Sequence, residues 1–433
     1  MTMHTLKRSL RSLLPSFVLS TYHFLLAVSG ALVYGFPSRK LIVVGVTGTD
    51  GKSSTTEYIN AVFEAAGYTT ALSNSIRVKV NEVTRPPTGR SMPGRFFIQR
   101  FFREALRSGC TVAIIEMTSE GVRQHRHRAI ELDALVFTNL SPEHIESHGS
   151  FRAYADAKFE IGRALERSMK RPRTVVANGD DPEGIRYLAL NVENKRGFSL
   201  KKTLPWSADD KNGSFTFEGQ KIDVALPGEF SLKNALAAAE VAAAFHIDIA
   251  SIQKGVASVK RIPGRLEAIN EGQEFKVVVD YALTPDALEK LYSTYDAQKK
   301  ICIFGATGGG RDTWKRPVLG KLAEKYCENV IVTNDIAYDE DPQKIADDIA
   351  GGMAKRPEII LDRREAIRRG LALAQARPDR SDVVVLVTGM GIDTEISAPT
   401  GAKEPWNEIA VVREELVRLK TVGHRAEDSI RRV

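Results

Sequence analysis

The sequence predicts an α/β fold of two domains, each built around a mostly parallel sheet with helices on its faces. Short β-branched and apolar runs alternate with helix-like segments along most of the 433 residues, which is the pattern of successive βαβ units. The run Arg261-Ile262-Pro263-Gly264-Arg265 interrupts this pattern, because proline and glycine end helices and strands alike. We therefore expect domains at 41–262 and 263–433, each long enough for its own core, preceded by a segment at 1–40.

The segment at 1–40 is apolar and basic. Between Ser16 and Phe36 no side chain is charged apart from His23, and basic residues lie on both sides: Lys7, Arg8, Arg11, Arg39 and Lys40. Twenty-one residues suffice to cross a bilayer, but basic residues on both sides favour neither orientation. No small-residue cleavage site indicates a signal peptide. Two interpretations stay open: an apolar helix or helical hairpin packed on the first domain, or contact of residues 16–36 with a membrane surface.

A glycine-rich turn joins the first apolar run, Leu41–Val44, to a helix-like segment. The turn ends in Gly51-Lys52-Ser53, although position 46 is valine where the strict Gly-x-x-x-x-Gly-Lys-Ser motif has glycine. Backbone N–H groups in such a turn face phosphates, the lysine reaches the outer phosphates, and the following hydroxyl coordinates magnesium. The turn therefore predicts a P-loop that binds ATP through Gly48, Thr49, Asp50, Gly51, Lys52, Ser53 and Ser54.

Further strands are expected where apolar runs alternate with helical stretches. In the first domain these runs are 112–117, 134–140 and 174–177, and in the second they are 276–282, 301–305, 329–333 and 382–388. Residues 213–226 alternate around Glu218-Gly219 and predict a hairpin appended to the first sheet. The alanine-rich run 234–245 predicts a helix.

Three side chains of the first domain suit a metal beside the phosphates. Glu116 ends a strand at the sheet edge where open α/β sheets bind ligands, and its carboxylate can hold Mg²⁺; a solvated edge glutamate is the alternative. His144 follows the next strand, where imidazole can ligate a metal or orient phosphate. Lys158 shares a helix face with Phe151 and Tyr154. Because a buried ammonium is costly, the Lys158 side chain is expected to pair with an anion, lose its proton or be chemically modified. The alternative is that it snorkels, so that its ammonium reaches solvent.

Composition restricts the classes of partner. The 61 basic and 54 acidic side chains give a net charge of +7, compatible with an anionic substrate or a membrane surface. No cluster of basic residues with interleaved aromatics indicates nucleic-acid binding, and His127, between two arginines, is expected on a solvated basic surface. The cysteines Cys110, Cys302 and Cys327 lie far apart without zinc-site spacing. We expect them to be reduced core residues of a cytoplasmic protein.

Several motifs follow the P-loop in order. They are Glu-Met-Thr-Ser-Glu-Gly-Val-Arg-Gln-His-Arg from Glu116, Asn-Leu-Ser-Pro-Glu-His-Ile-Glu-Ser-His-Gly from Asn139, and Tyr-Ala-Asp-Ala-Lys ending at Lys158. Together they resemble the Mur ligase family, in particular its members that add the third amino acid to the peptidoglycan stem. The resemblance implies a central P-loop ATPase domain and a C-terminal Rossmann-like ligase domain. It also implies an ATP-dependent carbon–nitrogen ligase of peptidoglycan synthesis, and so of cell shape and division, acting in the cytoplasm as a monomer.

The resemblance further implies residue roles. An amino acid would be joined to a muramoyl-dipeptide-like acceptor through an acyl phosphate, with these catalytic residues: Lys52, Glu116, His144, Lys158 and Arg265. Ser53 and Glu116 would hold one magnesium ion, and His144 with a carbamate on Lys158 would serve the second. Nucleotide contacts would include Asn234, Arg265 and Asp280. The acceptor would meet Thr118, Gln124 and Arg126, and substrate contacts in the C-terminal domain would be Arg311 and Asp335.

Three departures from the family pattern bear on the substrates. The N-terminal UDP-binding domain of the family has no counterpart, so the uridine goes unrecognised, a partner binds it, or the acceptor is lipid-linked. Asp335-Ile336-Ala337-Tyr338 replaces the Asp-Asn-Pro-Arg signature, which disfavours diaminopimelate as the incoming amino acid. Residues 389–393 and Leu283 also differ from the residues that the family usually has at these positions. Two alternatives stay open: a folylpolyglutamate or poly-amino-acid synthetase of the same superfamily, or an ATP-binding subunit that needs a partner.

Overall fold

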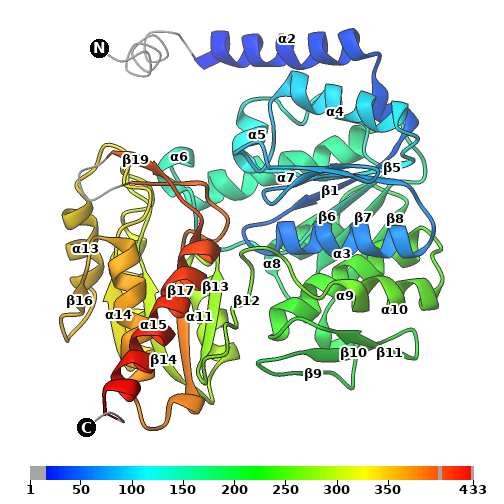
Figure 1. The fold of residues 1–433 in the computed structure, drawn as a ribbon. Helices are drawn as coiled ribbons and strands as arrows, with labels where there is room; N and C mark the ends of the chain where they lie inside the picture. Colours follow the sequence, from blue (N-terminus) through cyan, green and yellow to red (C-terminus); the bar gives the residue numbers. More distant parts are fainter. Residues whose placement is uncertain (1–15, 398–401, 431–433) are drawn as a thin grey trace.

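Two mostly parallel sheets organise residues 16–397 and 402–430, which the computed structural model describes (Figure 1). The first sheet has the order β4-β3-β2-β5-β1-β6-β7-β8. In this order, the neighbouring strands from β2 through β5, β1, β6 and β7 to β8 pair parallel. At the edge of the sheet, β3 pairs antiparallel with β2, and β4 pairs antiparallel with β3. The bounds are β1 (Ile42–Thr47), β2 (Thr70–Ser73), β3 (Val78–Val80), β4 (Val83–Arg85), β5 (Val112–Glu116), β6 (Ala134–Phe137), β7 (Thr174–Asn178) and β8 (Asn194–Phe198).

Helices cover both faces of the first sheet because successive strand side chains point to opposite sides. From β1, Val44 and Val46 join one core cluster, whereas Val43 joins the other. The first cluster is closed by α3 (Lys52–Ala65), α9 (Glu229–Ala244) and α10 (Ile249–Ser258). The second is closed by α4 (Arg95–Arg107), α7 (Phe151–Arg167) and α8 (Pro182–Leu188). Two short helices, α5 (Ser119–Arg123) and α6 (Ile145–His148), follow β5 and β6.

The predicted hairpin forms, but it does not belong to the first sheet. Strands β10 (Gly213–Phe217) and β11 (Gln220–Val224) pair antiparallel, and with β9 (Ser207–Ala208) they make a separate three-stranded sheet. Phe215 and Ile222 pack into the core cluster that lies under α9. The expectation of an appended hairpin is wrong because this unit joins the domain through side-chain packing instead of backbone hydrogen bonds.

The second large sheet has the order β12-β13-β17-β14-β15-β16, and all pairs are parallel except β12 with β13. Its strands are β12 (Glu267–Ala268), β13 (Lys276–Asp280), β14 (Lys299–Phe304), β15 (Asn329–Val332), β16 (Glu358–Ile359) and β17 (Val383–Thr388). One face carries α11 (Pro285–Thr294), α12 (Lys315–Tyr326) and α13 (Pro342–Ala350), and the other carries α14 (Arg363–Gln375) and α15 (Glu408–Ile430). A small hairpin, β18 (Glu395–Ser397) with β19 (Lys403–Pro405), lies apart from the sheet.

Ile262 packs in the core of the first domain and Leu266 in that of the second. The boundary after residue 262 stays a prediction. The two-domain α/β class with mostly parallel sheets is confirmed.

Two of the three cysteines form a disulfide, so the expectation of reduced thiols is wrong for them. Cys302 on β14 is bonded to Cys327, which follows α12, with 6.1 Å between their Cα atoms. Strands β14 and β15 are direct neighbours in the sheet, so the crossover through α12 returns the chain beside Cys302 although 25 residues separate the pair. Cys110 is free and buried, as expected.

Residues 16–34 form a single helix, α2 (Ser16–Tyr34), that lies across α4 at the edge of the first domain (Figure 1). Its buried positions are the small residues Ala27, Gly30 and Ala31. A Cβ at Gly30 would meet the Arg95 carbonyl oxygen at 3.5 Å, so the two helices approach closely. Most of its large side chains are exposed: Phe17, Tyr22, Phe24, Leu25, Leu32 and Val33. The Phe24 ring also contacts His125. By length and composition, α2 is the one candidate membrane span among the described residues.

Candidate active site between the two domains

The P-loop connects β1 to α3 and requires glycine at two positions. Gly48 has φ 152° and Gly51 has φ 80°, and a Cβ at these positions would collide with the side chains of Thr138 and Asn234 respectively. Asn139 holds the turn, because its carbonyl accepts from the Thr49 N–H at 2.9 Å and its Oδ1 accepts from the Asp50 N–H at 3.0 Å. The close approach of backbone to these side chains explains the glycines.

Two lysines converge on one carbonyl of this loop. Lys52 Nζ donates to the Gly48 oxygen at 3.1 Å and to the Thr49 oxygen at 2.7 Å. Lys158 Nζ donates to the same Gly48 oxygen at 2.7 Å and lies 4.8 Å from the ring centroid of Tyr154. Burial lowers the pKa of both ammonium groups, and Lys52 lowers the pKa of Lys158 further. Lys158 is 3% exposed, which excludes snorkelling to solvent.

Glu116 stands at the end of β5, beside Val46 of β1. It is fully buried, and Ser75 Oγ donates to its Oε2 at 2.8 Å. Its Oε1 is buried without a hydrogen-bond partner within the described part of the chain. Ser53, one residue after Lys52, is 4% exposed. A buried carboxylate oxygen without a donor, close enough to the P-loop for its charge to raise the pKa of Lys52, fits a hydrated magnesium ion. The alternative of a solvated edge glutamate is wrong.

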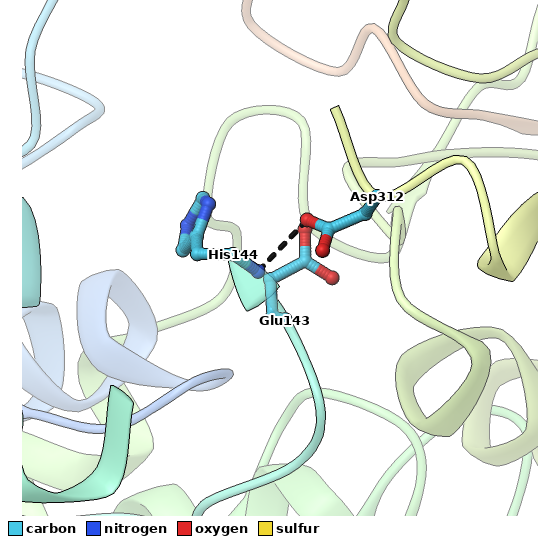
Figure 2. Close-up of side chains that lie close together, drawn as sticks. All are labelled: Glu143, His144 and Asp312. Carbon is cyan, nitrogen blue, oxygen red and sulfur yellow. Dashed lines mark hydrogen bonds between the residues drawn. The ribbon is translucent and has the colours of Figure 1, made fainter. Parts of the chain in front are cut away.

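His144 lies where the two domains meet (Figure 2). Ligand atoms of Glu143, His144 and Asp312 all lie within 4.8 Å of one another, and Figure 2 shows the carboxylates of Glu143 and Asp312 facing each other. Burial lowers the pKa of His144 to about 4, and Lys158 adds to this effect. Its imidazole is therefore neutral at pH 7 and can donate a ring nitrogen to a metal.

Three contacts join the domains around His144 and the P-loop. The Asp312 carboxylate accepts from the backbone N–H groups of His144 and Ile145 at 2.8 and 3.0 Å. Lys315 Nζ donates to Glu143 Oε1 at 2.8 Å. Thr284 Oγ1 donates to Asp50 Oδ2 at 3.2 Å. Through these contacts the C-terminal domain lies directly against the P-loop and the segment around His144 in the first domain.

A cleft of about 860 Å³ runs from the P-loop between the domains. Most of the predicted acceptor and substrate residues line it, together with P-loop and metal-site residues: Thr118, Gln124, Arg126, Arg311, His144, Lys158, Arg265, Thr49, Lys52 and Ser53. Asp335 does not line it. Its side chain is 2% exposed, and burial raises its pKa although the nearby Arg363 guanidinium lowers it. The carboxyl of Asp335 faces inward in this structure, and its role as a substrate contact stays a prediction.

Arg126 makes the acceptor end of the cleft strongly cationic. It is 6% exposed, donates from Nη2 to Gln124 Oε1 at 2.8 Å and from Nη1 to the Met92 carbonyl. Its Nε has no partner within the described residues. Burial, with Arg90 and Arg95 nearby, lowers its pKa to about 10. A guanidinium held there without a carboxylate partner suits an anionic group on a ligand.

A second cavity, of about 470 Å³, lies on the other side of the P-loop. Asp50, Gly51, Ser54 and Asn234 line it from the first domain, with Arg265 and Asp280 from the second, and Phe198 and Trp206 add aromatic surface. Arg265 and Tyr281 line both cavities, and the Arg265 guanidinium lies 4.6 Å from the Tyr281 ring centroid. Asp280 accepts from the Leu266 and Ala282 N–H groups at 2.7 Å each, so it also orders the start of the second domain.

The structure adds residues that the sequence interpretation did not single out: Ser75, Arg90, Glu143, Asp312 and Lys315. Glu143 lay inside the motif that begins at Asn139, but its contacts with Asp312 and Lys315 depend on how the domains meet. Ser75 and Arg90 lie outside regular elements and carried no periodic signal. His127 corrects a further expectation: it is 2% exposed, and burial lowers its pKa to about 3, so it is a core residue.

Comparisons with known proteins find relatives of both domains. Residues 46–242 match the Mur ligase middle domain, and residues 264–391 match the Mur ligase glutamate ligase domain. A UDP-N-acetylmuramoyl-L-alanyl-D-glutamate–2,6-diaminopimelate ligase from Syntrophomonas wolfei is 35% identical over 84% of this chain and 76% of its own length. The ligase of the same name from Aquifex aeolicus is 31% identical over 94% of this chain and 84% of its own length.

Solved structures share the fold. A UDP-N-acetylmuramoyl-L-alanyl-D-glutamate–2,6-diaminopimelate ligase matches with a TM-score of 0.59 at 24% identity, over 88% of this chain and 79% of that chain. The Mycobacterium tuberculosis folylpolyglutamate synthase complexed with ADP matches with a TM-score of 0.68 at 18% identity, over 84% of this chain and 91% of that chain. On the two domain matches and the identity to these relatives, the chain belongs to the Mur ligase family and is a ligase.

Proposed function

We propose that this ligase uses ATP to join an amino acid to a muramoyl-dipeptide-like acceptor, releasing ADP and phosphate, in the synthesis of peptidoglycan precursors. The observation that supports this most is the single cleft that runs from the P-loop past Lys158 and His144 to the cationic Arg126. The relatives that align with 84% and 94% of this chain are named as ligases of UDP-N-acetylmuramoyl-L-alanyl-D-glutamate.

The reaction proceeds in two displacements. An acceptor carboxylate oxygen attacks the γ-phosphorus of ATP, and the bond to the ADP oxygen breaks to leave an acyl phosphate. The neutral amine then attacks the carbonyl carbon, the tetrahedral intermediate expels inorganic phosphate, and the amine loses a proton. Lys52 and Arg265 lie where they compensate the negative charge that develops on the phosphates. Closure by Asp312 and Lys315 keeps water from the acyl phosphate.

The proposed metal sites use the residues that the family resemblance implies. Ser53 and Glu116 would hold one magnesium ion, and His144 with a carbamate on Lys158 would hold the second; bound magnesium neutralises phosphate charge. Carbamate formation needs a neutral amine that attacks carbon dioxide and releases one proton. The lowered pKa of Lys158 supplies that neutral amine. The carbamate also turns two neighbouring cations into an ion pair, which removes their repulsion.

The cationic lining assigns the two substrate ends. Arg126, with Arg90 and Arg95 nearby, meets an anionic group of the acceptor. On the C-terminal side, the Arg311 guanidinium lies 4.7 Å from the ring centroid of Tyr338 and serves the carboxylate of the incoming amino acid. Tyr338 stands where the diaminopimelate signature has arginine, so Arg311 is the guanidinium in this part of the cleft.

A membrane contact is the second part of the proposal. The face of α2 turned to solvent carries the large apolar side chains, whereas its small residues face α4, the reverse of a helix that packs in a soluble core. Exposed Arg39, Lys40, Arg100 and Arg107 flank it, which favours an anionic surface. Since the site uses ATP, this surface is the cytoplasmic face of the cell membrane.

The function is tested with purified full-length protein, ATP, magnesium, UDP-muramoyl-dipeptide and a panel of amino acids, measuring phosphate release and product mass. The expected product is the acceptor plus one amino acid minus one water. A parallel arm uses a lipid-linked muramoyl-dipeptide, and a folate arm tests the folylpolyglutamate alternative. Absence of acceptor-dependent phosphate with both muramoyl acceptors would refute the proposal.

The membrane contact is tested by co-sedimentation with phosphatidylglycerol vesicles. Leu25→Glu with Leu32→Glu should reduce binding by more than tenfold, because burial of each leucine contributes about 1.5–3 kcal/mol. Leu204→Glu is the matched control. Leu204 is 66% exposed and shortly precedes β9 in the chain, and Figure 1 shows β9 at the end of the first domain opposite α2. Wild-type protein that stays in the supernatant, or equal loss in the control, would contradict the contact.

A further inference from the structure

The loop after α5 presents alternate residues to the cleft and to helix α2. We name residues 124–129 the acceptor loop. Gln124 and Arg126 line the cleft, while the side chain of His125 between them points to α2, where its Nε2 lies 2.8 Å from Ser20 Oγ. The Phe24 ring meets the His125 ring edge to face, with centroids 6.1 Å apart and planes at 83°. The left-handed backbone of His125, with φ 54°, directs its side chain away from those of its neighbours.

Helix α4 and the residue Met92 just before it hold the backbone and the Arg126 side chain of the same loop. Arg95, its first residue, donates from Nε to the Gln124 carbonyl at 2.8 Å. Arg126 donates to the Met92 carbonyl just before the helix. These contacts do not involve the His125 ring. In the described part of the chain, Ser20 of α2 is the hydrogen-bond partner of that ring, and the ring's Nδ1 is buried without a hydrogen-bond partner.

The contact with α2 matters to the acceptor loop because the positive charges around Arg126 repel one another. Arg126 is buried close to Arg90 and Arg95, whose positive charges oppose its own. Glu120 offsets part of this repulsion. The contact of His125 with α2 adds a hold on the loop that does not depend on a ligand.

We propose that His125 is a positioning residue for acceptor binding, which ties the acceptor loop to α2 and so keeps Gln124 and Arg126 in the cleft. This inference rests on the proposed acceptor. It gives α2 a role inside the protein that is separate from any membrane contact. A change on α2 should therefore weaken the binding of a soluble acceptor in the absence of vesicles.

The kinetic test uses full-length variants with soluble UDP-muramoyl-dipeptide. Ser20→Ala removes the hydroxyl partner, Ser20→Thr keeps it, and Ser29→Ala is the matched control, because Ser29 is an exposed serine of the same helix. His125→Asn removes the ring, and asparagine tolerates the left-handed backbone. We expect KM for the acceptor to rise about fivefold in Ser20→Ala and about tenfold in His125→Asn, with kcat and KM for ATP within twofold. Ser20→Thr and Ser29→Ala should match the wild type.

Equal KM values for Ser20→Ala and Ser29→Ala would overturn the inference, as would a loss confined to kcat. A second readout needs no turnover: amide hydrogen exchange of the acceptor loop in the same full-length proteins. The N–H groups of His125, Arg126 and Arg128 are hydrogen-bonded to the carbonyls of Val122, Gly121 and His125. Their exchange should quicken about fivefold or more in Ser20→Ala and His125→Asn but not in Ser29→Ala. Unchanged exchange refutes the positioning role, whereas a wild type without acceptor-dependent turnover refutes only the proposed function.

Discussion

Substitution of Lys158 tests the carbamate most directly. Lys52 and Lys158 both donate to the Gly48 oxygen, at 3.1 and 2.7 Å, so their nitrogens lie at most about 6 Å apart. At an effective dielectric constant of about 20, like charges at that distance repel by roughly 2.8 kcal/mol, and opposite charges attract by as much. Conversion of the ammonium to a carbamate therefore reverses the sign of this interaction. A neutral side chain at position 158 forfeits about 3 kcal/mol of stabilisation, or about 10²-fold in rate.

The assay compares Lys158→Ala with Lys158→Met by acceptor-dependent phosphate release. Both should lose about 10²-fold in kcat. Added formate or acetate should restore activity about tenfold in Lys158→Ala, where the truncated side chain leaves room for a carboxylate. Methionine fills that room, so Lys158→Met should not respond.

The reasoning fails if Lys158→Met keeps a kcat within threefold of the wild type. It also fails if formate activates both variants equally, because the effect would then not depend on space at position 158.

Three further predictions follow from the same geometry. Glu116→Gln should raise the magnesium concentration needed for half-maximal phosphate release by about tenfold or more, because an amide replaces the unpartnered carboxylate oxygen; an unchanged titration would contradict the metal role. Arg126→Lys should raise KM for the acceptor by about tenfold to a hundredfold and leave KM for ATP unchanged, because lysine cannot make the bidentate contact. His127→Phe should remove a pH dependence of stability: burial lowers the pKa of His127 to about 3, below its ordinary 6.5, so the folded state loses stability as pH falls below 6.5. Urea unfolding at pH 7 and pH 5 should show the wild type losing about 2 kcal/mol more than the variant, with the exposed His246→Asn as control.

Local patterns were informative wherever the function depends on neighbouring residues. The strand, glycine turn and helix around Lys52 are adjacent in the chain, so the P-loop could be predicted from hydrophobic spacing and the Gly-Lys-Ser ending. The inward direction of Lys158 followed from its helical spacing to Tyr154, and the structure places that lysine 3% exposed. Glu116 at a strand end followed from the parallel sheet in the same way.

Contacts between distant segments were not accessible from such patterns. The pairing of Cys302 with Cys327 depends on β14 and β15 being neighbours. The hairpin at 213–224 had the right local form, but its attachment to a sheet is decided by packing against α9. His127 was expected on the surface because its neighbours are charged, although the turn of the chain after α5 buries it.

The amino-acid order alone determined the α/β class, the P-loop and the positions of Glu116, His144 and Lys158, because each depends on periodicity or on a few consecutive residues. The meeting of the domains decided the rest: Asp312 caps the backbone of His144, Lys315 pairs with Glu143, and Asp335 turns inward. These contacts join residues about 170 positions apart. Their energies depend on burial and closure, which no local stretch of sequence encodes.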